Sequence, residues 1–258
     1  MAVVLSHVED HVGKLTLNRP EAANAFSLEM LRELMNHLQE WKNERDIRVL
    51  LLTGAGEKVF SAGADLKERA NMNEDEVREA VGLIRKVVQS VHEFPKPVIC
   101  AINGAAIGGG LELALACDLR IASENASFAL SETGLGIIPG AGGTQRLPRL
   151  IGVHKAKEMI YTGRRLTATE ALQEGLLLKV TYRKELQDVG MDLAYDVSQR
   201  APLANSLAKQ AINQGIETDL EHGMEIEAEA YEKIIPTKDR LEGLAAFKEK
   251  RSPKFTGE

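Results

Sequence analysis

Short, nearly unbroken apolar runs alternate with longer amphipathic segments along the first two thirds of the chain. Residues 49–53 (VLLLT) and 98–102 (VICAI) are such runs, and this composition is typical of strands that are covered on both faces. Between them, residues 77–91 carry apolar side chains at the three- and four-residue spacing of a helix, which Pro95 and Pro97 end. The alternation predicts an α/β core in which helices pack on a sheet.

The two ends of the chain differ in pattern. Two short strands are expected within residues 3–17, then a helix capped by Ser27, and further strands at 119–122 and 127–130. After Pro202 the spacing is helical, at residues 203–213, about 217–234 and 238–248. We therefore expect a core with the active site over residues 1–200 and a helical region over residues 201–258 that covers the site or joins subunits.

Composition excludes several classes of partner. The net charge of the 258-residue chain is −6, which argues against broad affinity for nucleic acid or for acidic membranes. No apolar run approaches the length that crosses a bilayer, and the first residues include Glu9 and Asp10 instead of a targeting signal. Cys100 and Cys117 lie inside apolar runs, as buried thiols of a reducing compartment do. These observations predict a cytoplasmic protein.

Common catalytic signatures are absent from the sequence. No serine follows the G-x-S-x-G pattern, no H-E-x-x-H or Cys–His spacing suggests a metal, and no phosphate-binding G-x-x-x-x-G-K-[ST] loop is present. The glycine-rich segments near residues 54 and 134–143 also lack the spacing of a dinucleotide loop. We therefore expect neither a metal site nor serine-hydrolase or nucleotide-loop chemistry.

Three glycine-rich segments remain, each after a strand or at the start of a helix. They are residues 60–69 (FSAGADLKER), 101–122 (AINGAAIGGGLELALACDLRIA) and 130–149 (LSETGLGIIPGAGGTQRLPR). Glu112 and Glu132 each lie in an apolar neighbourhood, as a general acid and a general base with tuned pKa values would. The structural alternative makes Glu112 an ion-pair partner of Arg120 or Arg146, and Glu132 a cap or turn residue. Gly142 and Gly143 are interpreted as turn glycines.

These segments resemble the signature regions of the enoyl-CoA hydratase/isomerase (crotonase) family. The resemblance extends from LNRPEAANAFS at 17–27 to EGLAAFKEKRSPKFTG at 242–257. SAGADLKERANM and IPTKDRLEGLAAFKEKR look most similar to the methylglutaconyl-CoA hydratase branch, which includes an AU-rich RNA-binding protein. The resemblance implies a crotonase-like α/β core of repeated ββα units and a C-terminal helical region for oligomerisation. It also implies a homotrimer or a hexamer made of two trimers.

The resemblance further implies which residues form the catalytic site. The N–H groups of Ala64 and Gly109 would donate to the oxygen of a thioester, where negative charge develops. Glu112 and Glu132 would hold one water between them, one taking a proton as the water attacks C3 and the other protonating C2. The N–H of Gly140 would help to place that water.

The same resemblance implies a binding site for coenzyme A. Ala62, Ala64 and Leu66 match the strip around the adenine, and Lys67 would lie near the phosphates. Phe247 and Lys250 are expected to complete the pocket, across a subunit boundary. Because CoA is part of the acyl-CoA substrate, no separate cofactor is expected.

The function implied is an enoyl-CoA hydratase, which adds water reversibly and syn across the 2,3 double bond in fatty-acid or branched-chain amino-acid degradation. An isomerase of the same family is the alternative, but it can act with one acid at the position of Glu132, so Glu112 favours hydration. RNA binding is disfavoured because residues 28–46 carry five acidic side chains (Glu29, Glu33, Glu40, Glu44 and Asp46) against three basic ones (Arg32, Lys42 and Arg45). A methylglutaconyl group would need a cation for its second carboxylate, and the sequence points to none.

Overall fold

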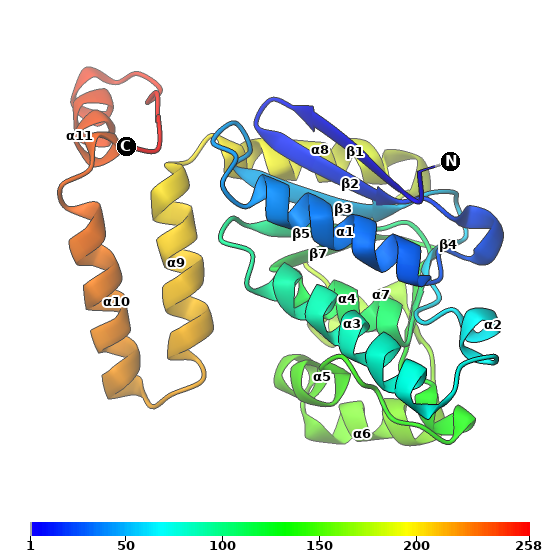
Figure 1. Cartoon of the computed structure of the whole chain (residues 1–258). Helices are drawn as coiled ribbons and strands as arrows, with labels where there is room; N and C mark the ends of the chain where they lie inside the picture. The colour runs from blue at the N-terminus through cyan, green and yellow to red at the C-terminus, as the bar shows by residue number, and fades with distance from the viewer. Residues whose placement is uncertain (1) are drawn as a thin grey trace.

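The computed structural model describes residues 2–258 as a core of two sheets with a helical unit beside it (Figure 1). The larger sheet contains β1 (Val4–Glu9), β2 (Val12–Leu17), β3 (Val49–Gly54), β5 (Val98–Ile102), β7 (Leu119–Ser123) and β10 (Lys179–Thr181), in that spatial order. The smaller sheet contains β4 (Val59–Ser61), β6 (Ala105–Ile107), β8 (Ser127–Ala129) and β9 (Leu166–Thr167).

Helices alternate with strands up to β10, and the only regular elements in the described chain after β10 are helices. Those of the core are α1 (Leu28–Trp41), α2 (Leu66–Arg69), α3 (Glu74–His92), α4 (Gly109–Ala116), α5 (Gly143–Ile151), α6 (Val153–Thr162), α7 (Ala168–Gln173) and α8 (Leu186–Ser198). Short 3-10 turns are η1 (Pro20–Ala22), η2 (Glu132–Leu135) and η3 (Arg183–Glu185). The helices expected after Pro202 are α9 (Pro202–Gly215), α10 (Leu220–Ile234) and α11 (Lys238–Glu249).

The core is built from a repeated unit of two strands and a helix. In each unit the first strand joins the larger sheet and the second joins the smaller one: β3 with β4, β5 with β6, and β7 with β8. Equivalent strands of successive units pair in parallel, so the helices that follow them begin at the same edge. The predicted α/β class of repeated ββα units is confirmed, and this stacking brings the three glycine-rich segments together.

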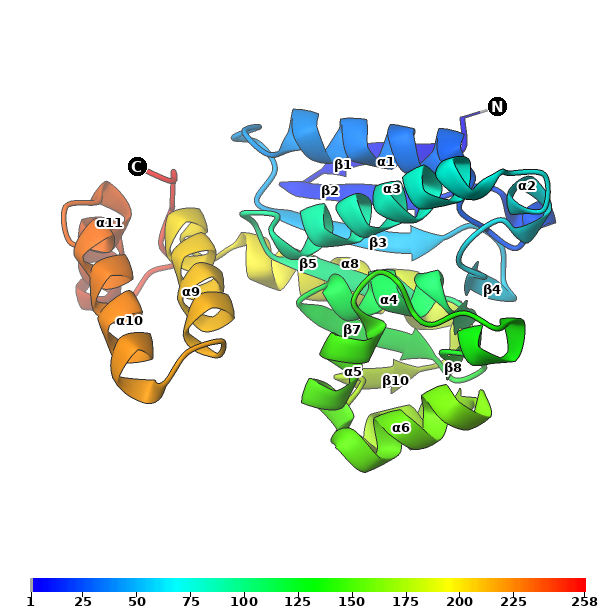
Figure 2. The same ribbon diagram turned by 60° about the horizontal axis from the view of Figure 1, so that its bottom comes forward.

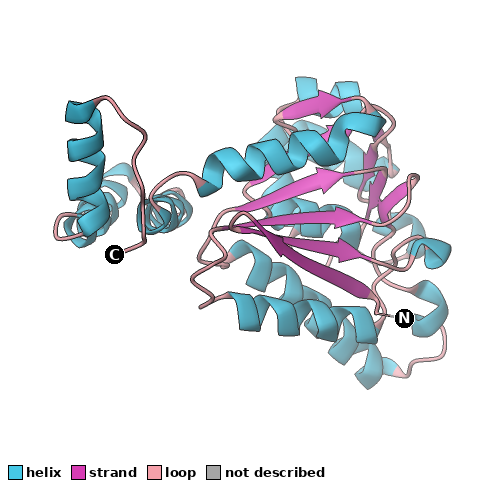
Figure 3. Cartoon of the chain, turned by 90° about the horizontal axis from the view of Figure 1, so that it is seen from above, coloured by secondary structure: helices cyan, strands magenta, loops and turns pink. Residues whose placement is uncertain are grey.

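Both faces of the larger sheet are covered, as the apolar strand runs predict. Leu50 and Leu52 of β3 pack into the cluster that includes α1, α3 and α4, whereas Val49 and Leu51 pack against α8. Figure 3 shows the helix that leads into the C-terminal unit crossing one face of this sheet. The sequence analysis did not anticipate this helix, α8, although it is needed to cover the second face.

The C-terminal helices stand beside the core in two views (Figures 1 and 2). Lys209 of α9 forms a 2.8 Å ion pair with Asp118 of the core, and Arg48 donates a 2.8 Å hydrogen bond to the carbonyl of Phe255. Large apolar side chains remain exposed on this unit, including Leu220 at 80 % and Phe247 at 85 %. Within residues 2–258, no helix combines the length and apolar character needed to span a bilayer.

Candidate active site

A cavity of about 560 Å³ lies where the glycine-rich segments converge. Its lining includes seven of the residues predicted to form the site: Ala62, Ala64, Leu66, Gly109, Glu112, Glu132 and Gly140. The rest of the lining is mostly apolar and comes from α3, from η2 and from the loop after η2: Val77, Val81, Ile84, Leu135, Ile137 and Ile138. The fold thus gathers segments separated by up to about 80 residues around one apolar space.

Two backbone N–H groups at this cavity have no acceptor within residues 2–258. Ala64 pairs with Phe26 in an isolated parallel bridge, in which both hydrogen bonds use the groups of Phe26: its N–H donates to Gly63 and its carbonyl accepts from Asp65. The Ala64 N–H therefore points away from Phe26. Gly109 is the first residue of α4, where N–H groups have no partner in the preceding turn and the helix dipole is positive.

At each of Gly108, Gly109 and Gly110, the missing side chain lets another group come close to the backbone. A side chain at Gly108, whose φ is +52°, would lie 3.0 Å from Oε1 of Glu132. A side chain at Gly109 would press on the ring of Phe26, and one at Gly110 would overlap the carbonyl of Ser61. The glycines thus let the N-terminus of α4 approach both an acid and the neighbouring strand segment.

Glu112 is hydrogen-bonded to the backbone of the loop that precedes α5 and of the first residue of α5. It is 3 % exposed, and its Oε1 accepts hydrogen bonds from the N–H groups of Ala141 (2.7 Å) and Gly143 (2.8 Å). Burial raises the pKa of Glu112 above its usual value, although these N–H groups and the charge of Arg146 offset part of that rise. The interpretation of Gly143 as a turn glycine is therefore wrong. Its backbone φ is not in the left-handed region that favours glycine, and its N–H donates a hydrogen bond to the Glu112 carboxylate. A glycine at the first position of a helix was the available signal.

Neither arginine considered as a partner of Glu112 forms an ion pair with it among residues 2–258. Arg120 donates to the carbonyls of Leu176 and Cys117, and Arg146 donates to the carbonyl of Ala141. Arg146 therefore supports the loop that holds Glu112 rather than the carboxylate itself.

Glu132 begins η2 on the other side of the cavity. Its Oε2 is buried without a hydrogen-bond partner among the described residues. Burial and the negative charge of Glu112 raise the pKa of Glu132 to about 7, since both disfavour a second carboxylate. The cavity thus contains one carboxyl group held as a hydrogen-bond acceptor and another that favours its proton near neutrality.

The residues predicted for coenzyme A are only partly brought together. Ala62, Ala64 and Leu66 line the cavity, and Lys67 is exposed on α2 beside them. Phe247 and Lys250 lie at the end of α11, outside the lining of this cavity in the single chain. Their predicted role therefore requires a second subunit.

Arg69 is a cavity residue that sequence reasoning missed. It is half-buried at the end of α2 and lines the cavity, and its guanidinium has no ion-pair or hydrogen-bond partner within residues 2–258. Its position three residues after Leu66 on one helical turn was the available signal, because residues at that spacing share a face. A cation is thus available to an anionic group that enters the cavity.

Comparison with known proteins gives consistent matches over the whole chain. The family model described as enoyl-CoA hydratase/isomerase matches residues 7–258. A putative enoyl-CoA hydratase/isomerase, YngF, from Bacillus subtilis is 56 % identical over 256 residues, which cover 99 % of this chain and 98 % of that protein. The human mitochondrial methylglutaconyl-CoA hydratase is 46 % identical over 95 % of this chain and 73 % of its own.

A solved structure shows the same arrangement in space. The crystal structure of an enoyl-CoA hydratase from Bacillus anthracis superposes with a TM-score of 0.98 at 55 % identity, covering 99 % of this chain and 100 % of that one.

Proposed function

This chain belongs to the enoyl-CoA hydratase/isomerase family, and from that premise we propose that it is an enoyl-CoA hydratase, adding water reversibly and syn across the double bond of a 2-enoyl-CoA. One observation carries the choice of hydration. Two carboxyl groups, that of the buried Glu112 and that of Glu132 with its buried Oε2, face one cavity beside two N–H groups that lack acceptors within residues 2–258. Moving a double bond requires one proton carrier, whereas adding water requires a base for the water and an acid for the carbon.

The proposed mechanism assigns each group a step. The thioester oxygen accepts hydrogen bonds from the N–H groups of Ala64 and Gly109, which stabilise the enolate as charge develops on it. Glu112, held as a carboxylate by two N–H groups, takes a proton from the water that attacks C3. Glu132, whose pKa is raised to about 7, donates its proton to C2. We propose that the N–H of Gly140 helps to place the water, and that the reaction uses no cofactor apart from the CoA of the substrate.

Purified protein can be assayed with crotonyl-CoA and with a 3-enoyl-CoA of equal length. Hydration of crotonyl-CoA is expected to be much faster than migration of the 3,4 double bond. Rapid migration with negligible hydration would favour the isomerase and remove the role given to Glu112. Inactivity on both substrates would reject the family's chemistry for this chain.

We propose further that the preferred acyl group carries a second carboxylate, which Arg69 binds. The support is a guanidinium without a partner among residues 2–258, in a cavity whose lining is otherwise mostly apolar apart from the two glutamates, together with relatives named methylglutaconyl-CoA hydratases. Arg69→Met should lower kcat/KM for a carboxylated enoyl-CoA by about 10- to 100-fold, the usual range for a charge-assisted hydrogen bond, and leave crotonyl-CoA nearly unaffected. Arg78→Met is the matched control, since Arg78 is an exposed arginine paired with Glu74 and Asp75. Equal losses on both substrates would assign Arg69 to coenzyme A instead.

We propose a homotrimer or a pair of trimers, with Phe247 and Lys250 reaching a neighbouring CoA site. The support is the exposed apolar surface of the C-terminal helices, on which Leu220, Met224 and Phe247 are more than 60 % exposed. Light scattering at micromolar concentration tests the assembly, and a monomer would reject it.

We also propose a cytoplasmic location, supported by two buried free cysteines. We propose no specific RNA binding, supported by the acidic side chains of α1.

A further inference from the structure

The peptide unit that joins Gly63 to Ala64 is held from one side. Its carbonyl oxygen accepts a 2.7 Å hydrogen bond from the N–H of Phe26, and the next N–H, that of Asp65, donates to the carbonyl of Phe26 at 3.2 Å. The carbonyl and N–H of a trans peptide point in opposite directions. Fixing the Gly63 carbonyl therefore aims the Ala64 N–H into the cavity, and a tilt of this peptide would turn the N–H away from a bound oxygen.

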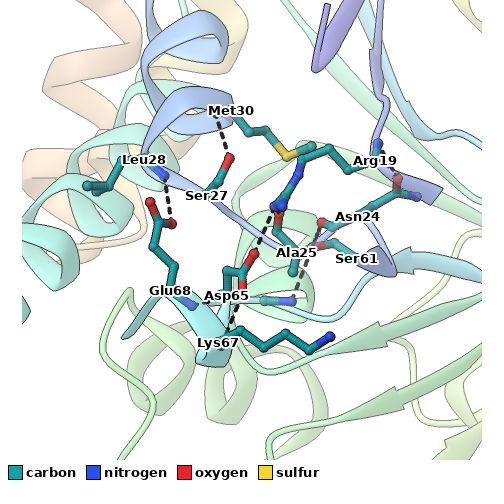
Figure 4. A network of polar contacts seen from close by, with 11 residues as sticks. Arg19, Asn24, Ala25, Ser27, Leu28, Met30, Ser61, Asp65, Lys67 and Glu68 are labelled. Carbon is teal, nitrogen blue, oxygen red and sulfur yellow. Dashed lines mark hydrogen bonds and ion pairs between the residues drawn. The ribbon is translucent and has the colours of Figure 1, made fainter. Parts of the chain in front are cut away.

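One nitrogen of the Arg19 guanidinium hydrogen-bonds to both segments of the Phe26–Ala64 bridge, directly beside that bridge (Figure 4). Nη1 of Arg19 donates to the carbonyl of Ala25 at 2.8 Å and to Oδ2 of Asp65 at 3.0 Å. Ala25 precedes Phe26 and Asp65 follows Ala64, so Arg19 ties together the neighbours of both bridged residues. The two side chains are 20 % and 13 % exposed, and a shielded pair of this kind is stronger than a surface pair.

Asp65 is held by both of its carboxylate oxygens. Oδ1 accepts from the N–H groups of Lys67 (3.1 Å) and Glu68 (3.3 Å) and so caps α2, while Oδ2 accepts from Arg19. Burial raises the pKa of Asp65, but the N–H of Glu68 and the guanidinium of Arg19 outweigh it, and the pKa lies below its usual range. The carboxylate is therefore ionised and fixed in orientation at neutral pH.

The segment that supplies Arg19 is itself anchored on buried side chains. Asn24 accepts from the N–H of Arg19 at 2.9 Å and donates to the carbonyl of Val59 at 3.0 Å. Ser61 donates to the carbonyl of Asn24 at 2.8 Å and accepts from the N–H of Gly63 at 3.1 Å. Asn24 and Ser61 are both fully buried, so the Arg19–Asp65 pair connects two parts of a rigid frame.

We infer that Arg19 and Asp65 are positioning residues, which set the angle of the Ala64 N–H for the thioester oxygen. The inference rests on the proposed function, because it takes this N–H to be one of the two oxyanion donors. Neither side chain lines the cavity, so their effect passes through the backbone of the Phe26–Ala64 bridge. The ion pair is expected to act on the rate of the chemical step, with little effect on binding of coenzyme A.

Kinetics of two variants provide the first test. Asp65→Asn keeps the size of the side chain and an oxygen to cap α2, and Arg19→Met keeps the apolar stem. Each should lower kcat by about 10- to 100-fold with KM nearly unchanged, because a misplaced donor loses much of its effect on the transition state. The double variant should lose little more than either single one, since both remove the same pair. Asp118→Asn is the matched control: it breaks the partly buried 2.8 Å pair with Lys209, beyond the far end of α4, and should leave kcat unchanged.

The carbonyl itself provides the second test. Infrared spectra of butyryl-CoA labelled with ¹³C at the thioester carbonyl report hydrogen bonding to that oxygen, which lowers its stretching frequency on binding. Wild type and Asp118→Asn should show the full lowering, and Asp65→Asn and Arg19→Met only part of it. Arg19→Lys, which keeps the charge near Asp65, should restore most of the shift and of kcat.

An unchanged kcat, or a lowered kcat with the full shift, would overturn the positioning role, as would loss of the shift in Asp118→Asn. If Asp65→Asn does not fold, the comparison of Arg19→Met with Arg19→Lys decides by the same criteria. Butyryl-CoA is saturated and cannot be hydrated, so the spectra test the positioning independently of hydration. A wild-type protein that shifts the carbonyl but hydrates no enoyl-CoA would reject the proposed function alone.

Discussion

The two acid-bearing regions of the cavity contain the same side chain with different hydrogen-bond partners, although burial raises the pKa of both. The segment over residues 139–143 directs two N–H groups at Glu112, whereas Oε2 of Glu132 in η2 is buried without a partner within residues 2–258. N–H donors stabilise a carboxylate, and burial beside another negative charge favours the protonated acid. The difference teaches that the backbone around each glutamate, and not the residue type, separates a proposed base from a proposed acid.

The comparison is tested most strongly by removing each acid in turn. Glu112→Gln and Glu132→Gln should each lower the rate of crotonyl-CoA hydration by about two to four orders of magnitude, the usual range for loss of a general acid or base. The losses should not add, because both groups are proposed to act on one water. Glu112→Gln should still exchange the C2 protons of butyryl-CoA with heavy water, and Glu132→Gln should not. Equal exchange in the two variants would contradict the assignment, and near wild-type hydration in either would remove that acid from the mechanism.

A smaller effect is expected from disturbing the support of Glu112 alone. A methyl group at Gly143 would lie 3.0 Å from Oε1 of Glu112 and 2.9 Å from the Leu130 side chain, so the carboxylate, Leu130 or the backbone at Gly143 must shift. Gly143→Ala should lower kcat by about 10- to 100-fold with little change in KM. Gly134→Ala in η2 is the matched control, since no atom lies within 4 Å of the added methyl group. Similar kcat values for the two variants would show that the N–H of Gly143 does not matter to the reaction.

The pH profile of the reaction tests the protonation state of Glu132. Because burial raises the pKa of Glu132 to about 7 and hydration uses its protonated form, kcat/KM should fall as the pH rises above about 7, approaching tenfold per pH unit. The residual rate of Glu132→Gln should lack this fall. A wild-type profile that stays flat to pH 9 would contradict the protonated state given to Glu132.

The smallest effect concerns stability. A folded-state pKa raised from 4.5 to about 7 stabilises the fold fully below pH 4.5, and this stabilisation is lost as the pH rises through 7. Since Gln does not ionise, the free energy of unfolding of Glu132→Gln should exceed that of wild type increasingly between pH 5 and 8. The gain should reach about 1–3 kcal/mol, which thermal unfolding at both pH values would detect as a few degrees. A constant difference across that range would mean that Glu132 titrates as it does in the unfolded chain.

Local pattern was enough for much of the architecture. The apolar runs at β3 and β5, the capping residue Ser27 and the helical spacing after Pro202 all depend on neighbours along the chain, and the structure places these elements where the patterns predict them. Helix α8 was not predicted, because the role of its apolar side chains is recognisable only where they pack against the second face of the larger sheet. The resemblance in the glycine-rich segments pointed to Glu112, Glu132, Ala64 and Gly109, which line one cavity; their roles remain proposals.

The sequence by itself determined the α/β alternation, the acidic character and the motif residues, because each is a property of composition or of spacing along the chain. Tertiary structure alone decided what surrounds those residues. The N–H groups that hold Glu112 come from 29 and 31 positions away, and the arginine that pairs with Asp65 from 46. It also showed that Arg69, in the cavity lining, is a cation without a partner among the residues that the structure describes. Protonation and the aim of an N–H depend on contacts through space, and no local pattern records which distant groups the fold brings within 3 Å.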